Sequence, residues 1–232
     1  ASVLDENAYP WIAKFPSNKD EINIGRWEFL VHELAQKAGI DTATAEIKNF
    51  SSDYDTFLTR RFDRTEDGER IHFASAMTLL GKKDGDGADT GVSYLDLAGF
   101  LMKNGAQVNK DLEQLWRRIV FYICVSNTDD HLRNHGFLLT DRGWILSPAY
   151  DMNPVATGGG LALNISKDDN AQSLDLARSV APVFRIDEVR MEEIIAEVVG
   201  AVSTWSDLAK QLKLPSREIS LMKNAFRVSE EK

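Results

Sequence analysis

Ionisable and amide side chains crowd one short stretch of this sequence, SNTDDHLRNHGF, at residues 126–137. It follows directly after the apolar run IVFYICV, where a buried element would ordinarily end in a simple turn. The side chains in question are those of Asp129, Asp130, His131, Asn134 and His135. Carboxylate, amide and imidazole groups can act as a general base or as ligands for a metal ion. The stretch is therefore the first candidate for a functional site.

Phosphoryl transfer is one chemistry that these residue types could perform. It needs a carboxylate near the attacking hydroxyl, oxygen ligands for Mg²⁺ and a lysine on the phosphates. Asp129 suits the base, Asn134 and Asp151 suit the oxygen ligands, and Lys14 in WIAK suits the lysine. Each residue also has an ordinary structural explanation, because Asp and Asn form turns and a strand lysine commonly faces solvent. Their order along the chain favours the functional interpretation.

A transition-metal site is the rival chemistry for the same stretch. The carboxylates and imidazoles between residues 129 and 135 are suitable ligands for zinc, manganese or iron, as in a metal-dependent phosphoesterase. A catalytic metal cluster normally takes ligands from several separate segments, whereas His32 and His72 stand in no metal-binding motif. The sequence favours phosphoryl transfer over this alternative.

The composition limits which functions are compatible with the chain. Its 232 residues are 43% hydrophobic and 27% charged, close to globular averages, so a sizeable core is expected. A formal net charge of −9 argues against a nucleic-acid-binding surface, which needs clustered lysine and arginine. The single cysteine, Cys124, lies in an apolar run and indicates a buried thiol in a reducing compartment. Because the sequence has no apolar run of about 18 residues and no signal-peptide pattern, we expect a cytoplasmic location and no membrane partner.

The first 75 residues predict a small antiparallel sheet interrupted by one helix. Strands are expected at residues 9–15, 43–50 and 56–62, and the turn TEDGER leads into a further strand-like segment, IHFAS. Apolar residues at three- and four-residue spacing predict an amphipathic helix over residues 26–38, ended by Gly39.

Helices dominate the rest of the chain. They are expected at residues 94–103, 110–126, 173–179, 187–203, 204–212 and 216–227. The segment GFLLTDRGWILSP predicts a hairpin that turns at residues 141–143, and residues 81–93 predict a Gly/Asp surface loop. The sequence therefore predicts an α+β fold, with a small β-rich N-lobe at residues 1–75 and a larger, mainly helical C-lobe at residues 76–232.

Several of these stretches together resemble a known family. NTDDHLRNHGFL and LSPAYDMNP, with WIAKFPS, FLTRRFDR and LALNISKDDNAQSLDLA, are similar to the kinase domain of the HipA-like serine/threonine kinases. These kinases are the toxins of bacterial type II toxin–antitoxin modules. The resemblance covers nearly the whole chain and implies a bilobal protein-kinase-like fold.

The resemblance also implies roles for individual residues. Lys14 would contact the nucleotide phosphates and Glu28 would pair with it, while Asp129 would be the catalytic base. Asn134 and Asp151 would hold Mg²⁺.

Other positions would form the nucleotide pocket or support it. The hinge segment against adenine would be Arg60, Arg61 and Phe62, acting through backbone groups. His131 and Tyr150 would line the nucleotide pocket. Asp130 and His135 have no chemical role in this scheme, and we expect them to orient the loop by hydrogen bonds.

The activity implied is transfer of the γ-phosphate of ATP, with Mg²⁺, to a serine or threonine of a protein. In the family the substrates include aminoacyl-tRNA synthetases, and a helix-turn-helix antitoxin regulates the kinase. DNA would be reached only indirectly, through that antitoxin.

The family also carries a Gly-rich loop just upstream of its WIAK-type strand, and that loop covers the phosphates. We expect the present chain, which starts at Ala1, to be a kinase-domain fragment lacking this loop. The alternative is a catalytically impaired or truncated kinase-like binding module that holds an antitoxin or another protein partner.

Overall fold

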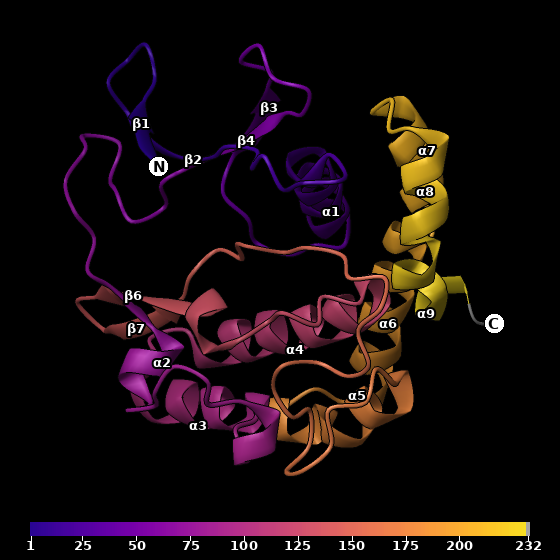
Figure 1. The fold of residues 1–232 in the computed structure, drawn as a ribbon. Coiled ribbons are helices and arrows are strands. Elements are labelled where there is room, and N and C mark those ends of the chain that lie inside the picture. The colour runs from indigo at the N-terminus through magenta and orange to yellow at the C-terminus, as the bar shows by residue number, and fades with distance from the viewer. Residues whose placement is uncertain (231–232) are drawn as a thin grey trace.

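A computed structural model describes residues 1–230 of the chain, and its first part is a four-stranded antiparallel sheet packed against one helix (Figure 1). The sheet has the order β1-β2-β4-β3. Its strands are β1 (Ser2–Leu4), β2 (Pro10–Lys14), β3 (Ala45–Lys48) and β4 (Thr56–Arg60), and the helix is α1 (Ile24–Lys37). The strands and helix expected in this region are confirmed. The strand predicted over residues 56–62 ends two residues early, at Arg60.

Helix α1 forms where the apolar periodicity predicted it. Asn23 caps its first turn, because its side-chain oxygen accepts a hydrogen bond from the main-chain N–H of Arg26 at 3.1 Å. One face of the helix, which includes Trp27 and Leu30, is fully buried against β3, β4 and helix α6 (Glu188–Val202). Gly39 follows the helix with a φ of +73°, as expected for a residue that ends it.

A second, three-stranded sheet contains the predicted hairpin. Its order is β5 (Phe73–Ser75), β6 (Gly136–Thr140) and β7 (Gly143–Leu146), all antiparallel. Thr140 pairs with Gly143, so the hairpin turns at residues 141–142. The strand formed by IHFAS thus pairs with residues more than 60 positions later and not with the first sheet. Strand β5 ends at residue 75, where the sequence suggested the lobe boundary, and its pairing with β6 joins the two parts of the chain.

The remaining helices lie below the first sheet in Figure 1, apart from α7 and α8, which rise beside α1. They are α2 (Ala76–Leu79), α3 (Tyr94–Asn104), α4 (Val108–Val125), α5 (Leu174–Val180), α6, α7 (Trp205–Gln211), α8 (Ser216–Met222) and α9 (Arg227–Glu230). Short 3₁₀ turns occur at Ala88–Thr90, Leu132–Asn134, Ala181–Phe184 and Lys223–Phe226. The single helix expected over residues 216–227 is therefore wrong in detail, since a 3₁₀ turn interrupts it at Lys223. Residues 231–232, which the sequence assigns to the second lobe, lie outside the described residues.

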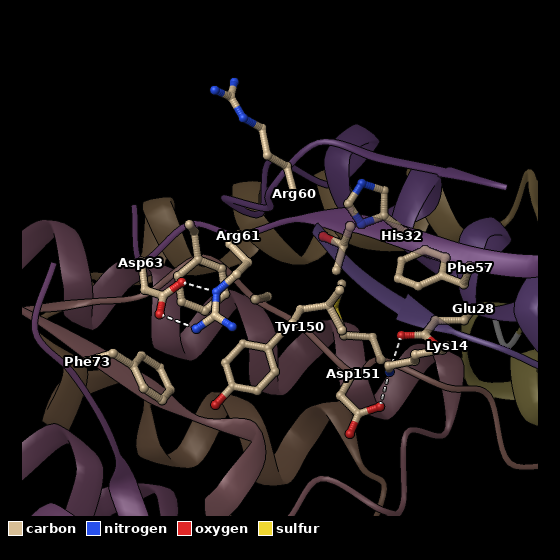
Figure 2. A pocket seen from close by; sticks show the side chains of 15 residues that line it. Lys14, Glu28, His32, Phe57, Arg60, Arg61, Asp63, Phe73, Tyr150 and Asp151 are labelled. Atoms are coloured by element: carbon tan, nitrogen blue, oxygen red, sulfur yellow. Dashed lines mark hydrogen bonds and ion pairs between the residues drawn. The ribbon is translucent and has the colours of Figure 1, made fainter. Parts of the chain in front are cut away.

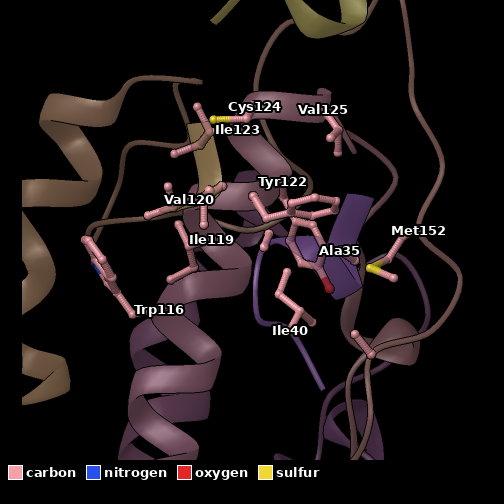
Figure 3. Close-up of a cluster of buried hydrophobic side chains, with 14 of the residues drawn as sticks. Ala35, Ile40, Trp116, Ile119, Val120, Tyr122, Ile123, Cys124, Val125 and Met152 are labelled. Atoms are coloured by element: carbon pink, nitrogen blue, oxygen red, sulfur yellow. The ribbon is translucent and has the colours of Figure 1, made fainter. Parts of the chain in front are cut away.

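Helix α4 is the central element of the core. Every residue from Leu115 to Val125 has at most 4% of its surface exposed. Figure 3 shows its apolar side chains meeting Ala35 and Ile40 from the α1 region and Met152 from the segment after β7. The core is therefore continuous between the first sheet's helix and the helical part of the chain. The loop that follows α4 starts from a rigid support.

No helix within residues 1–230 is long and apolar enough to cross a membrane.

Candidate functional site

A cavity of about 250 Å³ lies between the first sheet and the segment that follows β7 (Figure 2). Its walls come from β2, α1, β4 with the loop after it, β5, and residues 149–152. Apolar surface predominates, and a few charged groups gather at one end, as is usual for small-molecule sites.

Lys14, Glu28 and Asp151 meet at the charged end of this cavity. The Nζ atom of Lys14 donates to Glu28 Oε1 at 2.5 Å and also to Asp151 Oδ1 (Figure 2). Lys14 is the last residue of β2, Glu28 lies on the second turn of α1, and Asp151 follows β7. Asp151 has a φ of +58°, a left-handed conformation that Asp tolerates better than most residues. Three segments far apart in sequence are thus joined through one ammonium group.

Burial determines the charge state of this group of residues. Glu28 is only 3% exposed, and burial raises its pKa to about 7, although Lys14 favours the charged form. Burial lowers the pKa of Lys14, but the attraction of Glu28 and Asp151 outweighs it, so the pKa of Lys14 is raised overall. Lys14 therefore stays cationic at neutral pH, and Glu28 is the member of the group that titrates near neutrality.

His32 is a wall residue that the sequence did not identify. It lies four residues after Glu28 on α1, so both side chains point to the same face of the helix and line the cavity. Burial lowers the pKa of His32 to about 4, which makes it a neutral wall beside Phe57. The four-residue spacing from Glu28 was the available signal.

The hinge segment lies along the opposite wall. The side chain of Arg60 points away from the cavity and packs over the Tyr9 ring, 3.6 Å from its centroid (Figure 2). The guanidinium of Arg61 makes two hydrogen bonds to Asp63, at 2.8 and 2.5 Å.

Some main-chain groups of the same segment are already hydrogen-bonded within the protein. The main-chain N–H of Arg60 donates to Thr44 at 2.8 Å, and that of Arg61 donates to Pro10 at 3.1 Å. No hydrogen bond within residues 1–230 uses the main-chain N–H or carbonyl of Phe62. Of the three predicted hinge residues, Phe62 is the one with backbone groups available to a ligand.

Aromatic rings close the hinge end of the cavity. Phe62 packs against Phe73 and Tyr150, with centroids 5.8 and 5.6 Å away. The Tyr150 hydroxyl donates to the main-chain oxygen of Arg133 at 2.7 Å, and burial raises the pKa of this hydroxyl. Tyr150 therefore joins the cavity wall to the loop after α4.

The loop after α4 carries Asp129 and Asn134. It begins at Ser126, whose φ of +50° ends the helix in a left-handed turn. The Asp129 carboxylate is exposed, and its main-chain oxygen accepts a hydrogen bond from Asn134 Nδ2 at 3.1 Å. The loop is tied to the segment after Asp151, because the N–H of Asn153 donates to Asn127 Oδ1 at 3.2 Å. Asp129 and Asn134 thus occupy the neighbouring loop and are not part of the cavity lining.

His131 has a different position from the one expected. It lines a second cavity of about 380 Å³ together with Arg133 and residues 83–89, and it is absent from the lining of the first. His131 immediately precedes the 3₁₀ turn at Leu132–Asn134.

Asp130 and His135 support the loop from beneath, as the sequence analysis expected. Both are at most 1% exposed, and Asp130 Oδ2 accepts hydrogen bonds from the Tyr94 hydroxyl at 2.6 Å and from His135 Nε2 at 2.7 Å. A buried carboxylate with two such partners is well held. The expected hydrogen bonds of these two residues are present, while Asp130 Oδ1 and His135 Nδ1 are buried without a partner in the described part of the chain. That they orient the loop stays a prediction.

Oxygen atoms suited to Mg²⁺ lie beside Lys14. The Asp151 side chain is 39% exposed, and within residues 1–230 its carboxylate bonds through Oδ1, which leaves Oδ2 to a ligand. Asn153 Oδ1 is buried without a partner in the described part of the chain, while its Nδ2 donates to Asp151. Carboxylate and amide oxygens are the ligands that Mg²⁺ takes in proteins, so these residues fit the ion. Among residues 1–230 no three His, Cys, Asp or Glu side chains are grouped to hold a metal, which argues against the transition-metal cluster.

Comparisons with known proteins agree with the fold. HipA of Shewanella oneidensis MR-1, solved in a toxin–antitoxin complex with HipB and its operator DNA, superposes with a TM-score of 0.73. It is 20% identical, and the match covers 94% of this chain and 56% of that one. CtkA, a proinflammatory kinase of Helicobacter pylori, superposes with a TM-score of 0.58 at 12% identity, over 91% of this chain and 93% of that one.

Two proteins with related sequences are both named putative kinases. A "Putative kinase" of Haemophilus influenzae is 25% identical over 151 residues, which is 61% of this chain and 44% of the relative. The "Putative kinase Y4dM" of Sinorhizobium fredii is 26% identical over 227 residues, 89% of this chain and 54% of the relative. The chain spans about half the length of these curated relatives.

The fold is the bilobal, α+β fold of protein-kinase-like proteins. The model of the HipA-like C-terminal domain matches residues 2–206, and the chain belongs to that family. The family resemblance read from the sequence is confirmed.

Proposed function

We propose that this chain is the catalytic part of an ATP- and Mg²⁺-dependent serine/threonine protein kinase of the HipA-like toxin family. The observation that carries the proposal is the junction of Lys14 with Glu28 and Asp151 at one end of a largely apolar cavity. In protein kinases the same three residue types link the phosphates, the first helix and the metal.

The apolar end of the cavity suits adenine. In this proposal the purine lies between the aromatic wall and β2, and its edge bonds to the free backbone groups of Phe62. Arg60 and Arg61 shape the hinge with their side chains turned to Tyr9 and Asp63.

The charged end of the cavity suits the phosphates. Lys14 is cationic at neutral pH and is held by Glu28, so it can contact phosphate oxygens without a large rearrangement. Asp151 would hold Mg²⁺ together with Asn134 from the neighbouring loop, and Asn153 Oδ1 is a further oxygen beside Asp151. The ion neutralises charge on the phosphates when it is bound. With lobes at residues 1–75 and 76–232, as we propose, these groups would lie on either side of the nucleotide.

Asp129 would accept the proton of the substrate hydroxyl. Its carboxylate is exposed, so a serine or threonine of another protein can reach it. The loop that carries it is fixed by the buried bonds of Asp130 to Tyr94 and His135, which favours a constant position of the base.

The proposal about binding partners rests on the family and not on the geometry of the site. The Shewanella relative was solved with HipB and its operator DNA. We propose that the present chain likewise meets a helix-turn-helix antitoxin, that it contacts DNA only through that antitoxin, and that it acts in the cytoplasm. Its substrate would be a protein, with an aminoacyl-tRNA synthetase as the first to test.

The test is phosphate transfer from labelled ATP with Mg²⁺, measured as labelled protein and as released ADP. Asp129→Ala should lower the rate by about 10²- to 10⁴-fold, the usual contribution of a general base. Asp168→Ala, at another exposed aspartate, is the matched control and should keep the wild-type rate. Equal rates for wild type and Asp129→Ala would remove Asp129 from the role. ATP binding without transfer by the wild type would support the binding-module alternative instead.

A further inference from the structure

Helices α7 to α9 and the 3₁₀ turn between α8 and α9 lie at the side of the molecule where α1 begins (Figure 1). Almost all of this region follows residue 206, where the match to the family model stops. None of its residues lines the cavity described above. Its contacts nevertheless reach both segments that supply Lys14 with its partners.

Glu218 on α8 holds the first turn of α1. Its side chain is buried, with 6% exposed, and Oε2 accepts hydrogen bonds from the main-chain N–H of Asn23 at 3.1 Å and from Trp27 Nε1 at 2.9 Å. The N-terminus of a helix favours a negative charge, because its free N–H groups point outward. Trp27 immediately precedes Glu28, so this bond fixes α1 one residue away from the partner of Lys14.

A second set of contacts fixes the same turn. Arg26 Nη1 donates to the main-chain oxygens of Leu212 and Lys213, at 3.1 and 3.2 Å, between α7 and α8. The ring of Trp27 packs on Phe226, 6.4 Å between centroids, and Phe226 stacks on Trp205 at 4.4 Å. Polar and apolar contacts thus hold α1 against the C-terminal helices.

The same helices hold the segment that contains Asp151. Asn224 Nδ2 donates to the main-chain oxygen of Ala156 at 2.7 Å, five residues after Asp151. Arg227 donates to Gln172 Oε1 at 2.6 Å and to Ser126 Oγ at 3.3 Å. Ser126 is the residue at which the loop bearing Asp129 begins.

We propose that residues 212–227 form a C-terminal brace that sets the geometry of the nucleotide site. Glu218 is a positioning residue that holds α1 where Glu28 meets Lys14, and Asn224 is a positioning residue for the segment after Asp151. The reason is that the two partners of Lys14 belong to separate parts of the chain, and both parts are tied to the same short C-terminal region. The effect on ATP binding rests on the proposed function, whereas the effect on α1 does not.

The first experiment measures ATP affinity with Mg²⁺ by calorimetry in three variants of the full chain. Glu218→Ala should weaken binding about tenfold, while Glu218→Gln, which keeps an acceptor oxygen, should stay within about twofold of wild type. Ser220→Ala is the matched control on the same helix, because within residues 1–230 its hydroxyl bonds only to the main-chain oxygen of Ser216. Loss of affinity in Glu218→Gln equal to that in Glu218→Ala would overturn the positioning role.

A double-mutant cycle separates positioning from general stability. If Glu218 acts through Glu28, then Glu218→Ala should cost less than about twofold further affinity in a Glu28→Gln background. The same tenfold loss in both backgrounds would show that Glu218 acts elsewhere and would overturn the proposal.

Hydrogen exchange without ATP tests the brace independently of the proposed function. Peptides covering residues 24–30 should exchange about tenfold faster in Glu218→Ala than in Glu218→Gln. Peptides covering residues 153–158 should exchange faster in Asn224→Ala, which removes a single hydrogen-bond donor, than in wild type. Unchanged exchange in both segments would refute the brace. A wild-type chain that binds no ATP would refute the proposed function alone, since the exchange result would still decide the brace.

Discussion

Replacing Glu28 with glutamine should increase the stability of the protein relative to wild type as pH rises from about 4.5 to about 7, while weakening its nucleotide site. Glu28 is 3% exposed, and burial raises its pKa from 4.5 to about 7, with Lys14 offsetting only part of the cost. At about 1.36 kcal/mol per pKa unit, this rise corresponds to roughly 3 kcal/mol that the folded state loses when Glu28 ionises.

The sign follows from proton binding. Between pH 4.5 and about 7, Glu28 is protonated in the folded protein and ionised in the unfolded chain. The stability contributed by the raised pKa is therefore fully present below pH 4.5, the pKa of Glu28 in the unfolded chain, and is lost as the pH rises to about 7. Glutamine does not titrate. The free energy of unfolding of Glu28→Gln, relative to wild type, should rise by roughly 3 kcal/mol across this window and then stay level.

The assay is urea denaturation at a series of pH values from about 4.5 to 8, followed by calorimetric titration with ATP and Mg²⁺. Glu33→Gln, on the same helix but outside the cavity, is the control and should follow the wild-type curve. Parallel curves for wild type and Glu28→Gln would refute the assignment of a costly buried carboxylate. Stronger ATP binding by Glu28→Gln would refute its role as the partner of Lys14.

Three further predictions concern the supports of the site and core. Tyr94→Phe removes the donor of the 2.6 Å bond to Asp130 and should lower the free energy of unfolding by about 1–3 kcal/mol; an unchanged urea midpoint would contradict this. Gly25→Ala would put a Cβ 2.4 Å from a main-chain oxygen and should cost about 1–3 kcal/mol in thermal or urea unfolding. The matched Gly200→Ala, with nothing within 4 Å, should be neutral or stabilising by up to about 1 kcal/mol, and equal losses in both variants would refute the steric explanation. Cys124 is fully buried, and burial raises its pKa to about 12, so a thiol reagent at neutral pH should label it only after denaturation; rapid labelling of the native protein would disprove its burial.

Local patterns predicted most of the elements correctly. The helix over residues 26–38 follows from the spacing of its apolar residues and from Gly39, and the hairpin turn at residues 141–142 follows from Asp141, Arg142 and Gly143 between two strand-like runs. Both signals lie within a few residues of the structure that they specify. The pairing of β5 with β6 has no such signal, because it depends on residues about 60 positions apart.

The residues chosen from the sequence for the candidate site are likewise only partly brought together. Lys14, Glu28, Asp151 and Tyr150 were chosen from the sequence, and the structure brings them to one cavity. His131 was chosen on the same grounds, but it lines another cavity.

The sequence by itself determined which chemical groups this protein has and in which local elements they stand. The tertiary structure decided which of them meet. Glu28 becomes a group that titrates near pH 7 only because α1 buries it beside Lys14. Glu218 becomes a support of the same helix across 195 residues of sequence. Hydrogen bonds and burial act over a few ångströms in space, so their partners are fixed by packing and not by distance along the chain.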